Sequence, residues 1–327
     1  MMNRRTLLAG MAAGGLHATQ SAQAQAQAWS PTRPITVFVP FPPGGLLDPI
    51  ARRLGEKLSV QLKTPVIVEN RPGANTMIGA LAASKAPADG HSLLFTTDAS
   101  ITINPFLFRK MSYDAARDFV PVTLVCETVE CLIASAKVPA NNLREFVAWA
   151  KREGKKVNYG SYGIGSNAHL GTSEFEHQTG TDMNHVPYKG QADLYQALLA
   201  GDIQFVIGTT GIATQHIQDG KLKLIAPLRQ KRAPLFPQVP TAPEQGFPTL
   251  LGGAWFGYLA PAGTPAAAVQ RIGAEIQKAA DDADFQDRLV KLGLESTEGG
   301  ADVMARRLDT DRVRYKTLID RLQIKLD

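Results

Sequence analysis

Long apolar runs are missing from this chain of 327 residues. No stretch reaches the roughly 18 apolar residues of a transmembrane helix, so the mature chain is not expected to span a bilayer. Blocks of lysine and arginine are missing as well. The 35 basic side chains are spread among 30 acidic ones, which argues against nucleic acid as a partner. The mild positive excess favours the approach of an anion without identifying one.

Cysteine is scarce, with Cys126 and Cys131 the two in the sequence. No histidine lies near them in sequence, which argues against a catalytic cysteine or a metal pair. If segments 122–127 and 131–134 are paired strands, the two thiols could face each other and form a disulfide in an oxidising compartment. They could equally be two small buried apolar side chains, and the sequence leaves both interpretations open.

Motifs of catalysis and of cofactor binding are weak or absent. Ser161 and Ser166 do not sit in the Gly-x-Ser-x-Gly turn of a hydrolase, and segment 163–168 fits a dinucleotide fingerprint only loosely. Three histidines recur at a spacing wider than metal sites use, and we expect solvent-facing or capping roles for them: His169, His177 and His185. We therefore expect no catalytic residue, no metal and no cofactor.

The first 28 residues are typical of a secretory signal peptide. Arg4 and Arg5 form a basic start, and an apolar run from Leu7 to Leu16 follows. Segments 22–24 and 26–28 both read Ala-Gln-Ala and offer the small residues that a signal peptidase needs. The two arginines also suit the twin-arginine route, so export by Sec or by twin-arginine transport stays open. The sequence predicts a periplasmic protein.

The rest of the chain repeats one unit, an apolar run followed by a Gly/Ser/Thr loop and a helical pattern, which is typical of α/β folds. We expect strands at 35–40, 66–69, 92–96, 122–127, 131–134, 156–159, 203–207, 222–226 and 255–260. We expect helices after Asp48, before Ala86, at 143–152, up to Gly180, and at 192–200, 265–280, 283–292 and 302–322. Segment 112–122 is interpreted as a surface connection.

The order of these elements predicts two lobes. The chain passes into a second domain near 122–134, and the strand at 255–260 crosses back. Lobe 1 is then discontinuous, with residues 29–127 and 252–327, and lobe 2 holds residues 128–251. A length of 327 residues suits two domains of ordinary size.

Two glycine loops are the candidate anion sites. Gly44-Gly45 and the loop from Gly163 to Gly165 each follow a strand and precede a helix. Glycine lets the backbone approach a ligand, and the free N–H groups and dipole of the following helix favour an anion. Asp48 precedes Pro49 and is interpreted as a helix N-cap or as a ligand contact.

These loops carry a resemblance to a known family. The chain resembles the Bug family of extracytoplasmic solute receptors, the TctC-like receptors of tripartite tricarboxylate transporters. The resemblance covers essentially the whole mature chain and rests on these segments: Phe41-Pro42-Pro43-Gly44-Gly45, Glu69-Asn70-Arg71-Pro72-Gly73-Ala74, Asn158-Tyr159-Gly160-Ser161, Gly165-Ser166 with His169-Leu170, His185-Val186-Pro187-Tyr188-Lys189-Gly190, Pro240-Thr241 with Glu244-Gln245-Gly246, and Ala260-Pro261-Ala262-Gly263-Thr264-Pro265.

The resemblance implies a periplasmic-binding-protein fold of type II, with two α/β lobes and a ligand cleft between them. Because ligands of α/β sheets lie beyond the carboxyl ends of strands, we expect the ligand contacts at the ends of both sheets. The expected contacts are Phe41, Pro43, Gly44, Gly45, Asp48, Thr97, Ser100, Ser161, Gly165, Ser166, Asn167, His169, Gly208 and Thr209.

The sequence departs from the family pattern at two places. Asn75-Thr76-Met77 stands where family members often carry Gly-Gly-Asn, and Gly208 stands where they often carry an aspartate after the strand. Without that acid, one candidate partner for a ligand amino or hydroxyl group is missing, which counts against an amino-acid ligand.

The function that the resemblance implies is capture of a small carboxylate, either a di- or tricarboxylate or an aromatic acid. The receptor would deliver this ligand to a membrane permease with a large and a small subunit, and we expect it to act as a monomer. Two alternatives stay open. One is a binding protein that reports its ligand state to a membrane signalling partner, and the other is an exported enzyme.

Overall fold

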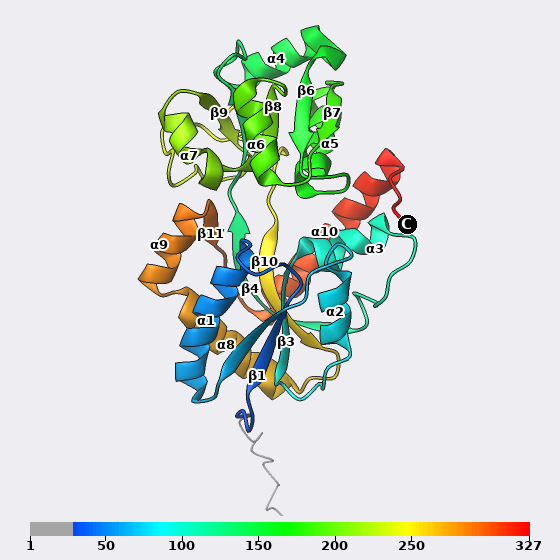
Figure 1. Ribbon diagram of the computed structural model, residues 1–327, viewed down its shortest axis with the longest axis vertical. Helices are drawn as coiled ribbons and strands as arrows, with labels where there is room; N and C mark the ends of the chain where they lie inside the picture. The colour runs from blue at the N-terminus through cyan, green and yellow to red at the C-terminus, as the bar shows by residue number, and fades with distance from the viewer. Residues whose placement is uncertain (1–28) are drawn as a thin grey trace, which may run out of the picture.

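The computed structural model describes residues 29–327 and shows two lobes stacked along the long axis of the molecule (Figure 1). Each lobe is an α/β unit built around one mixed sheet. The predicted signal peptide lies outside the described residues. No helix among those described has the length and apolar character needed to cross a membrane.

The first lobe contains a six-stranded sheet, in the order β11-β4-β10-β3-β1-β2. Strand β1 pairs in parallel with β2 and β3, whereas β10 runs antiparallel to β3 and β4. The bounds are β1 Ile35–Val39, β2 Val66–Asn70, β3 Ser92–Thr97, β4 Phe119–Thr128, β10 Trp255–Pro261 and β11 Leu294–Ser296.

Helices cover both faces of this sheet, and each face has its own apolar core. Helices α1, α8 and α9 supply one core with side chains such as Leu54, Ile272 and Phe285. Helices α2 and α10 supply the other, with Ala80 and Met304. The bounds are α1 Leu47–Leu62, α2 Met77–Ser84, the π-helical turn η1 Ala99–Ile103, α3 Asn104–Leu107, α8 Ala266–Ala280, α9 Ala283–Lys291 and α10 Ala301–Leu322.

The second lobe contains a five-stranded sheet, in the order β7-β6-β8-β5-β9. Strand β6 is parallel to β7 and β8, and β5 is antiparallel to β8 and β9. The bounds are β5 Glu130–Ser135, β6 Asn158–Ser161, β7 Asn184–Pro187, β8 Phe205–Thr209 and β9 Leu222–Pro227. Its helices are α4 Leu143–Glu153, the short 3₁₀ turn η2 Gly154–Lys156, α5 Asn167–Thr179, α6 Gln191–Ala200 and α7 Thr210–Gln218.

The chain crosses between the lobes from β4 to β5 and again from β9 to β10. The two crossings lie side by side, because the Thr128 N–H donates to the Ala254 carbonyl over 2.9 Å and the Ala254 N–H donates to Thr128 Oγ1 over 2.8 Å. A third contact joins the Val129 N–H to the Gly293 carbonyl of the first lobe. The carboxyl ends of β3 and β4 therefore face those of β6 and β8 across the waist of the molecule.

The expected elements are present, with differences at several ends. Strand β4 begins at Phe119, so the interpretation of segment 112–122 as a surface connection is wrong for its last residues. Pro121 suggested a loop because it lacks an N–H, but the pairing with β10 shifts register between Tyr258 and Leu259, and such a bulge accommodates proline. The short elements η1, α3, β7, α7 and β11 were not predicted.

The disulfide between Cys126 and Cys131 does not form in this structure, where both thiols are free and buried. The condition for a disulfide, pairing of segments 122–127 and 131–134, is not met, because β4 and β5 belong to different sheets. Cys126 packs in a core of the first lobe and Cys131 in a core of the second. At about 3.3 Å per extended residue, the five residue steps between them allow a separation of up to about 16 Å. A disulfide needs the two Cα atoms within roughly 7 Å.

We therefore predict that both thiols stay unlinked in protein taken from the periplasm. Iodoacetamide should label neither in the native protein, because both side chains are inaccessible and burial raises the pKa of each thiol. Both should be labelled after denaturation without a reductant. Recovery of a linked 126–131 peptide in a non-reducing digest would contradict this prediction.

Candidate functional site

A cavity of about 690 Å³ lies between the two lobes, at the edge where strands of both sheets end. Its walls in the first lobe are the loop after β1, the segment before α2 and the end of β3. Its walls in the second lobe are the segments that precede α5, α6 and α7. The expected contacts on these walls are Phe41, Gly45, Thr97, Gly165, Ser166, Asn167, Gly208 and Thr209.

The loop after β1 is folded onto itself. The Gly44 N–H donates to Asp48 Oδ2 over 3.0 Å, and the Gly45 N–H donates to the Pro42 carbonyl. The N–H groups of these two glycines are therefore not free to bind a ligand. Asp48 is not the N-cap either, since α1 begins at Leu47 and the Asp48 carboxylate lies in its first turn, paired with Arg52. Pro43 and Gly44 are exposed and lie outside the cavity walls.

Hydrogen bonds with residues at the start of α5 hold the loop before this helix in place. Ser166 caps the helix by accepting from the His169 N–H, and its own hydroxyl donates to the Gly163 carbonyl. Gly165 has a φ of +78°, a conformation that favours glycine, and its N–H donates to His169 Nδ1 over 3.1 Å. A Cβ atom at Gly165 would approach Leu107 of the other lobe to 2.5 Å. This loop therefore touches the first lobe directly.

Two histidines brace this loop and do not enter the cavity. The rings of His169 and His185 stack with centroids 4.2 Å apart, and the Tyr159 ring stacks on the other side of His185. Burial lowers the pKa of His169 to about 4, so its ring is neutral and Nδ1 can accept the Gly165 N–H. Ser161 lies behind the loop as well, within 2.7 Å of His185 Nε2. Among the described residues no cluster of three or more His, Cys, Asp or Glu could hold a metal ion.

Buried hydroxyl groups that hydrogen-bond to one another surround the end of β3. Ser100 is fully buried, with Oγ hydrogen-bonded to Thr96 and Thr76, so it supports the wall without facing the cavity. Ala74, Asn75 and Thr76 all have positive φ without being glycine, and Thr76 is β-branched, which makes this segment strained. The Asn104 side chain holds the segment by donating to the Asn75 carbonyl over 2.7 Å. The residues that replace the family's Gly-Gly thus form part of the wall.

Two helices of the second lobe begin at the cavity with backbone N–H groups that are not hydrogen-bonded. Within the described chain, the Asn167 N–H and the N–H groups of Gln191 and Ala192 make no hydrogen bond. Ser166, Asn167, Gly190 and Gln191 line the cavity at these two helix starts. Lys189 joins them as the single lysine or arginine on the wall among residues 29–327. Together these groups make one side of the cavity favourable for an anion.

Two buried acids on the cavity wall were not predicted from sequence. Asp98 is 1% exposed and Glu130 is 3% exposed, and both line the cavity. Burial raises the pKa of Asp98 to about 6, helped by the charge of Asp311. Burial raises the pKa of Glu130 to about 7, helped by the charge of Asp98. A signal for Asp98 existed, since it directly follows Thr97 at a strand end, whereas Glu130 was expected in the short connection between segments 122–127 and 131–134.

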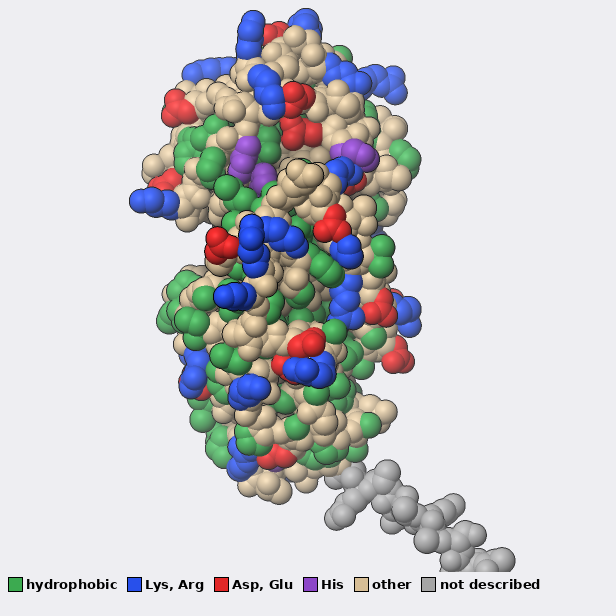
Figure 2. All heavy atoms as spheres, turned by 90° about the vertical axis from the view of Figure 1, so that its right-hand side faces the viewer, with side chains coloured by type: hydrophobic (Ala, Val, Ile, Leu, Met, Phe, Trp, Pro, Cys, Tyr) green, Lys and Arg blue, Asp and Glu red, His purple; other side chains and the backbone are tan. Residues whose placement is uncertain are grey.

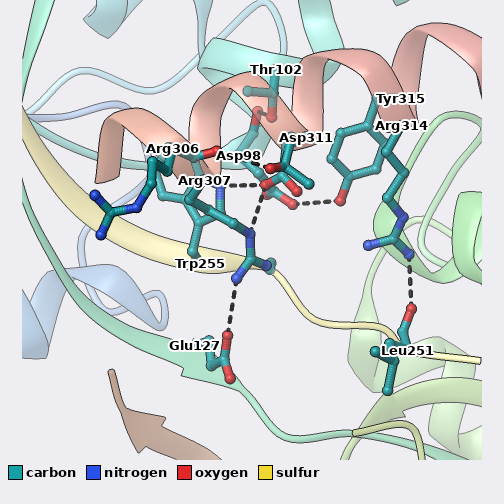
Figure 3. Close-up of polar contacts among 12 residues, drawn as sticks. Asp98, Thr102, Glu127, Leu251, Trp255, Arg306, Arg307, Asp311, Arg314 and Tyr315 are labelled. Carbon is teal, nitrogen blue, oxygen red and sulfur yellow. Dashed lines mark hydrogen bonds and ion pairs between the residues drawn. The ribbon is translucent and has the colours of Figure 1, made fainter. Parts of the chain in front are cut away.

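A polar network on α10 joins the lobes behind the cavity. Figure 3 shows Arg307 reaching toward Glu127 of β4 while Asp311 accepts from Trp255 Nε1 over 2.9 Å. On the same helix the Tyr315 hydroxyl donates to Asp98 over 2.8 Å. Arg314 donates to the Leu251 carbonyl of the second lobe over 2.9 Å. Seen from the side that carries the C-terminus, lysine and arginine side chains gather at the waist between the lobes (Figure 2).

Comparison with known sequences gives one family. The profile of the tripartite tricarboxylate transporter family receptor, TctC, matches residues 50–324. Protein BugT of Bordetella pertussis is 37% identical over 235 residues, which cover 72% of this chain and 72% of BugT.

Solved structures agree with the sequence comparison. MatC from Rhodopseudomonas palustris, solved with bound malate, superposes with a TM-score of 0.73 at 30% identity and covers 88% of this chain and 99% of its own. An R. palustris protein solved with adipate gives a TM-score of 0.75 at 28% identity and covers 90% of this chain and 99% of its own. These similarities confirm the two-lobed periplasmic-binding-protein fold.

The hydrogen bond from the Gly165 N–H to His169 leads to a prediction for the stability of the protein. Replacing His169 with alanine leaves the buried Gly165 N–H without its acceptor, and we expect a loss of about 1–3 kcal/mol in the free energy of unfolding. Urea denaturation measures this loss. His177→Ala is the matched control, because His177 is exposed on the same helix and should change stability little. Equal effects of the two substitutions would show that the His169 contact does not support the loop.

Proposed function

This chain belongs to the tripartite tricarboxylate transporter receptor family, and from that membership we propose that it captures a small carboxylate between its lobes in the periplasm. Relatives solved with malate and with adipate show that receptors of this fold hold small carboxylates. In this proposal the first lobe consists of residues 29–127 and 252–327, and the second lobe consists of residues 128–251. The ligand lies where both sheets end.

The single observation that carries this proposal is the convergence of free helix starts on the cavity. The N–H groups of Asn167 and Gln191, the first residues of α5 and α6, make no hydrogen bond within the described chain, and both residues line the cavity of about 690 Å³. Helix N-termini bind carboxylates through their unpaired N–H groups and their dipole. We therefore assign the ligand carboxylate to Ser166, Asn167, Gly190 and Gln191, with Lys189 nearby. The loop at Phe41 and Gly45 covers the ligand from the other lobe.

The family also supports a partner and a location for this receptor. We propose that the protein is exported through its N-terminal 28 residues and docks transiently on a membrane permease of the tripartite type. Delivery of the ligand requires the lobes to open. The contacts across the cleft include the ion pair of Arg321 with the half-buried Glu174, and ion pairs near the surface contribute about 0–1 kcal/mol. This pair is weak enough to break during opening.

Binding is tested by a thermal shift screen against carboxylates. A ligand at about 100 times its dissociation constant stabilises a protein by about 2.7 kcal/mol. For a mature chain of about 300 residues that unfolds as one unit, this corresponds to a rise in Tm of about 4 °C. A panel of di-, tri-, aromatic and amino carboxylates in which no compound raises the Tm would contradict the proposed function.

The position of the carboxylate is tested at Gly190. Its φ lies in the extended region and a Cβ atom there meets nothing within 4 Å, so larger residues fit without strain. We expect Gly190→Leu to fill the helix start and abolish the ligand-induced shift at unchanged Tm of the free protein. Gly190→Ala is the matched control and should retain binding. Equal ligand shifts in Gly190→Leu and in the wild type would move the carboxylate elsewhere in the cavity.

Transport is tested in cells. A strain that lacks this receptor should lose uptake of the ligand identified by the thermal shift screen, and the wild-type gene should restore it. A copy of the gene without residues 1–28 should not restore uptake, because the receptor would stay in the cytoplasm. Normal uptake in the deletion strain would contradict a transport role.

A further inference from the structure

Two carboxyl groups from opposite lobes lie on the wall of one cavity. Asp98 follows β3 in the first lobe, and Glu130 is the first residue of β5 in the second. Both lie on the cavity wall and both are more than nine-tenths buried. Glu130 pairs across the sheet with Thr209, one position beyond Gly208. Side chains alternate between the two faces of a strand, so Glu130 and position 208 point to opposite faces of this sheet. Glu130 is therefore a separate acid at the same end of the sheet and does not replace the aspartate missing at position 208.

The protein itself does not neutralise these two acids. Asp98 Oδ2 accepts from Asn167 Nδ2 over 2.9 Å and from the Tyr315 hydroxyl, but its Oδ1 is buried without a partner. The backbone N–H of Gly253 lowers the pKa of Glu130 but does not offset the effect of burial. Within residues 29–327 neither acid forms an ion pair with lysine or arginine. A buried carboxylate without a cation is unfavourable, so burial favours the protonated form of both acids in the free protein, and a cation bound beside them would stabilise the ionised form.

The nearest guanidinium groups are occupied elsewhere. Arg307 pairs with Asp311 and Glu127, and Arg314 donates to the Leu251 carbonyl. Lys189 is exposed at the cavity wall beside the helix starts. A ligand with two or three carboxylates would place negative charge next to Asp98 and Glu130. A ligand with a carboxylate at one end and a cation at the other suits both sides of the cavity.

We propose that the ligand is a small amino carboxylate whose protonated amine lies between Glu130 and Asp98 while its carboxylate lies at the starts of α5 and α6. This inference rests on the proposed function and specifies its ligand. An ammonium group has three donors and a full charge, so it can satisfy the open acceptor of Asp98 and the Glu130 carboxylate together. A hydroxyl group donates one hydrogen bond and leaves both charges uncompensated.

The pKa values of the free protein agree with this assignment. Both acids have a raised pKa, to about 6 for Asp98 and about 7 for Glu130, chiefly because of burial. An ammonium group favours the ionised acids, so the affinity for an amino carboxylate should rise with pH through this range. The charged and titratable groups that face the pair are Arg307, Asp311, Arg314 and Tyr315 of α10, Tyr162 of the loop after β6, Tyr195 of α6 and Cys131 of β5.

The test compares matched pairs of compounds by calorimetry. The pairs are aspartate with succinate, glutamate with glutarate, 4-aminobutanoate with butanoate, 5-aminopentanoate with pentanoate, and 3-aminobenzoate with benzoate. We expect the amino member of at least one pair to bind about tenfold tighter or more than its partner at pH 7.5, as for a charge-assisted contact. We expect this preference to weaken about tenfold at pH 5.5, where both acids are largely protonated.

Substitutions test whether Asp98 and Glu130 cause the preference for compounds with an amine. Glu130→Gln keeps the shape and removes the charge, so it should bring the two members of a pair to similar affinity without lowering the Tm. Asp98→Asn should act in the same direction and keeps an oxygen that can accept from Asn167. Glu176→Gln is the control, because Glu176 is a partly buried acid of the same lobe that does not line the cavity. It should leave the preference unchanged.

The outcomes separate this inference from the proposed function. If the compounds without an amine bind as tightly as their partners or tighter, the amine site is wrong and carboxylate capture stands. The amine site is also wrong if Glu130→Gln folds and keeps the full preference. If no carboxylate of any kind binds the wild type, the proposed function fails and the amine site fails with it.

Discussion

The two crossings between the lobes are the constraint on which the rest of the structure depends. Thr128 and Ala254 hold them together through two hydrogen bonds, so the sheets meet end to end at a narrow waist. Helix α10 strengthens this waist, because Arg307 pairs with Glu127 and Arg314 bonds to Leu251. The Arg229 side chain adds an ion pair of 2.7 Å to Glu295 across the same boundary. The strand ends of both lobes consequently line one cavity.

This geometry gives the cavity two chemically different sides. The helix starts before α5 and α6 offer backbone donors and lie near Lys189, whereas Asp98 and Glu130 present buried carboxyl groups. The glycine loop at Gly44 and Gly45 has no amide to spare, since both N–H groups are bonded within the loop. The Leu46 and Leu47 N–H groups at the start of α1 also make no hydrogen bond within the described chain, and both residues line the cavity, so both lobes offer backbone donors to an anion.

Contacts across the cleft are of two kinds. The Asn167 side chain donates to Asp98, and Gly165 lies against Leu107, so the loop before α5 makes close contact with the first lobe. An apolar cluster adds to this contact with side chains from α3, α5 and α10: Ile103, Leu107, Leu170, Tyr315, Leu318 and Ile319. Among the buried members of this cluster, Leu170 of α5 is the one that the second lobe contributes, and burial of apolar area stabilises by about 25 cal/mol per Å².

The sequence by itself determined the family, the α/β class, the two-lobed organisation and most of the helices, because these follow from motifs and periodic patterns that are local in the chain. It also placed Thr97, Asn167, Gly208 and Thr209 near one edge, since parallel strands end together. Only the tertiary structure decided that Cys126 and Cys131 belong to different cores, and that the Gly44 N–H is taken by Asp48. Only the fold brought Asp98 and Glu130 together, because they come from different lobes, and burial and charge act between residues that meet in space.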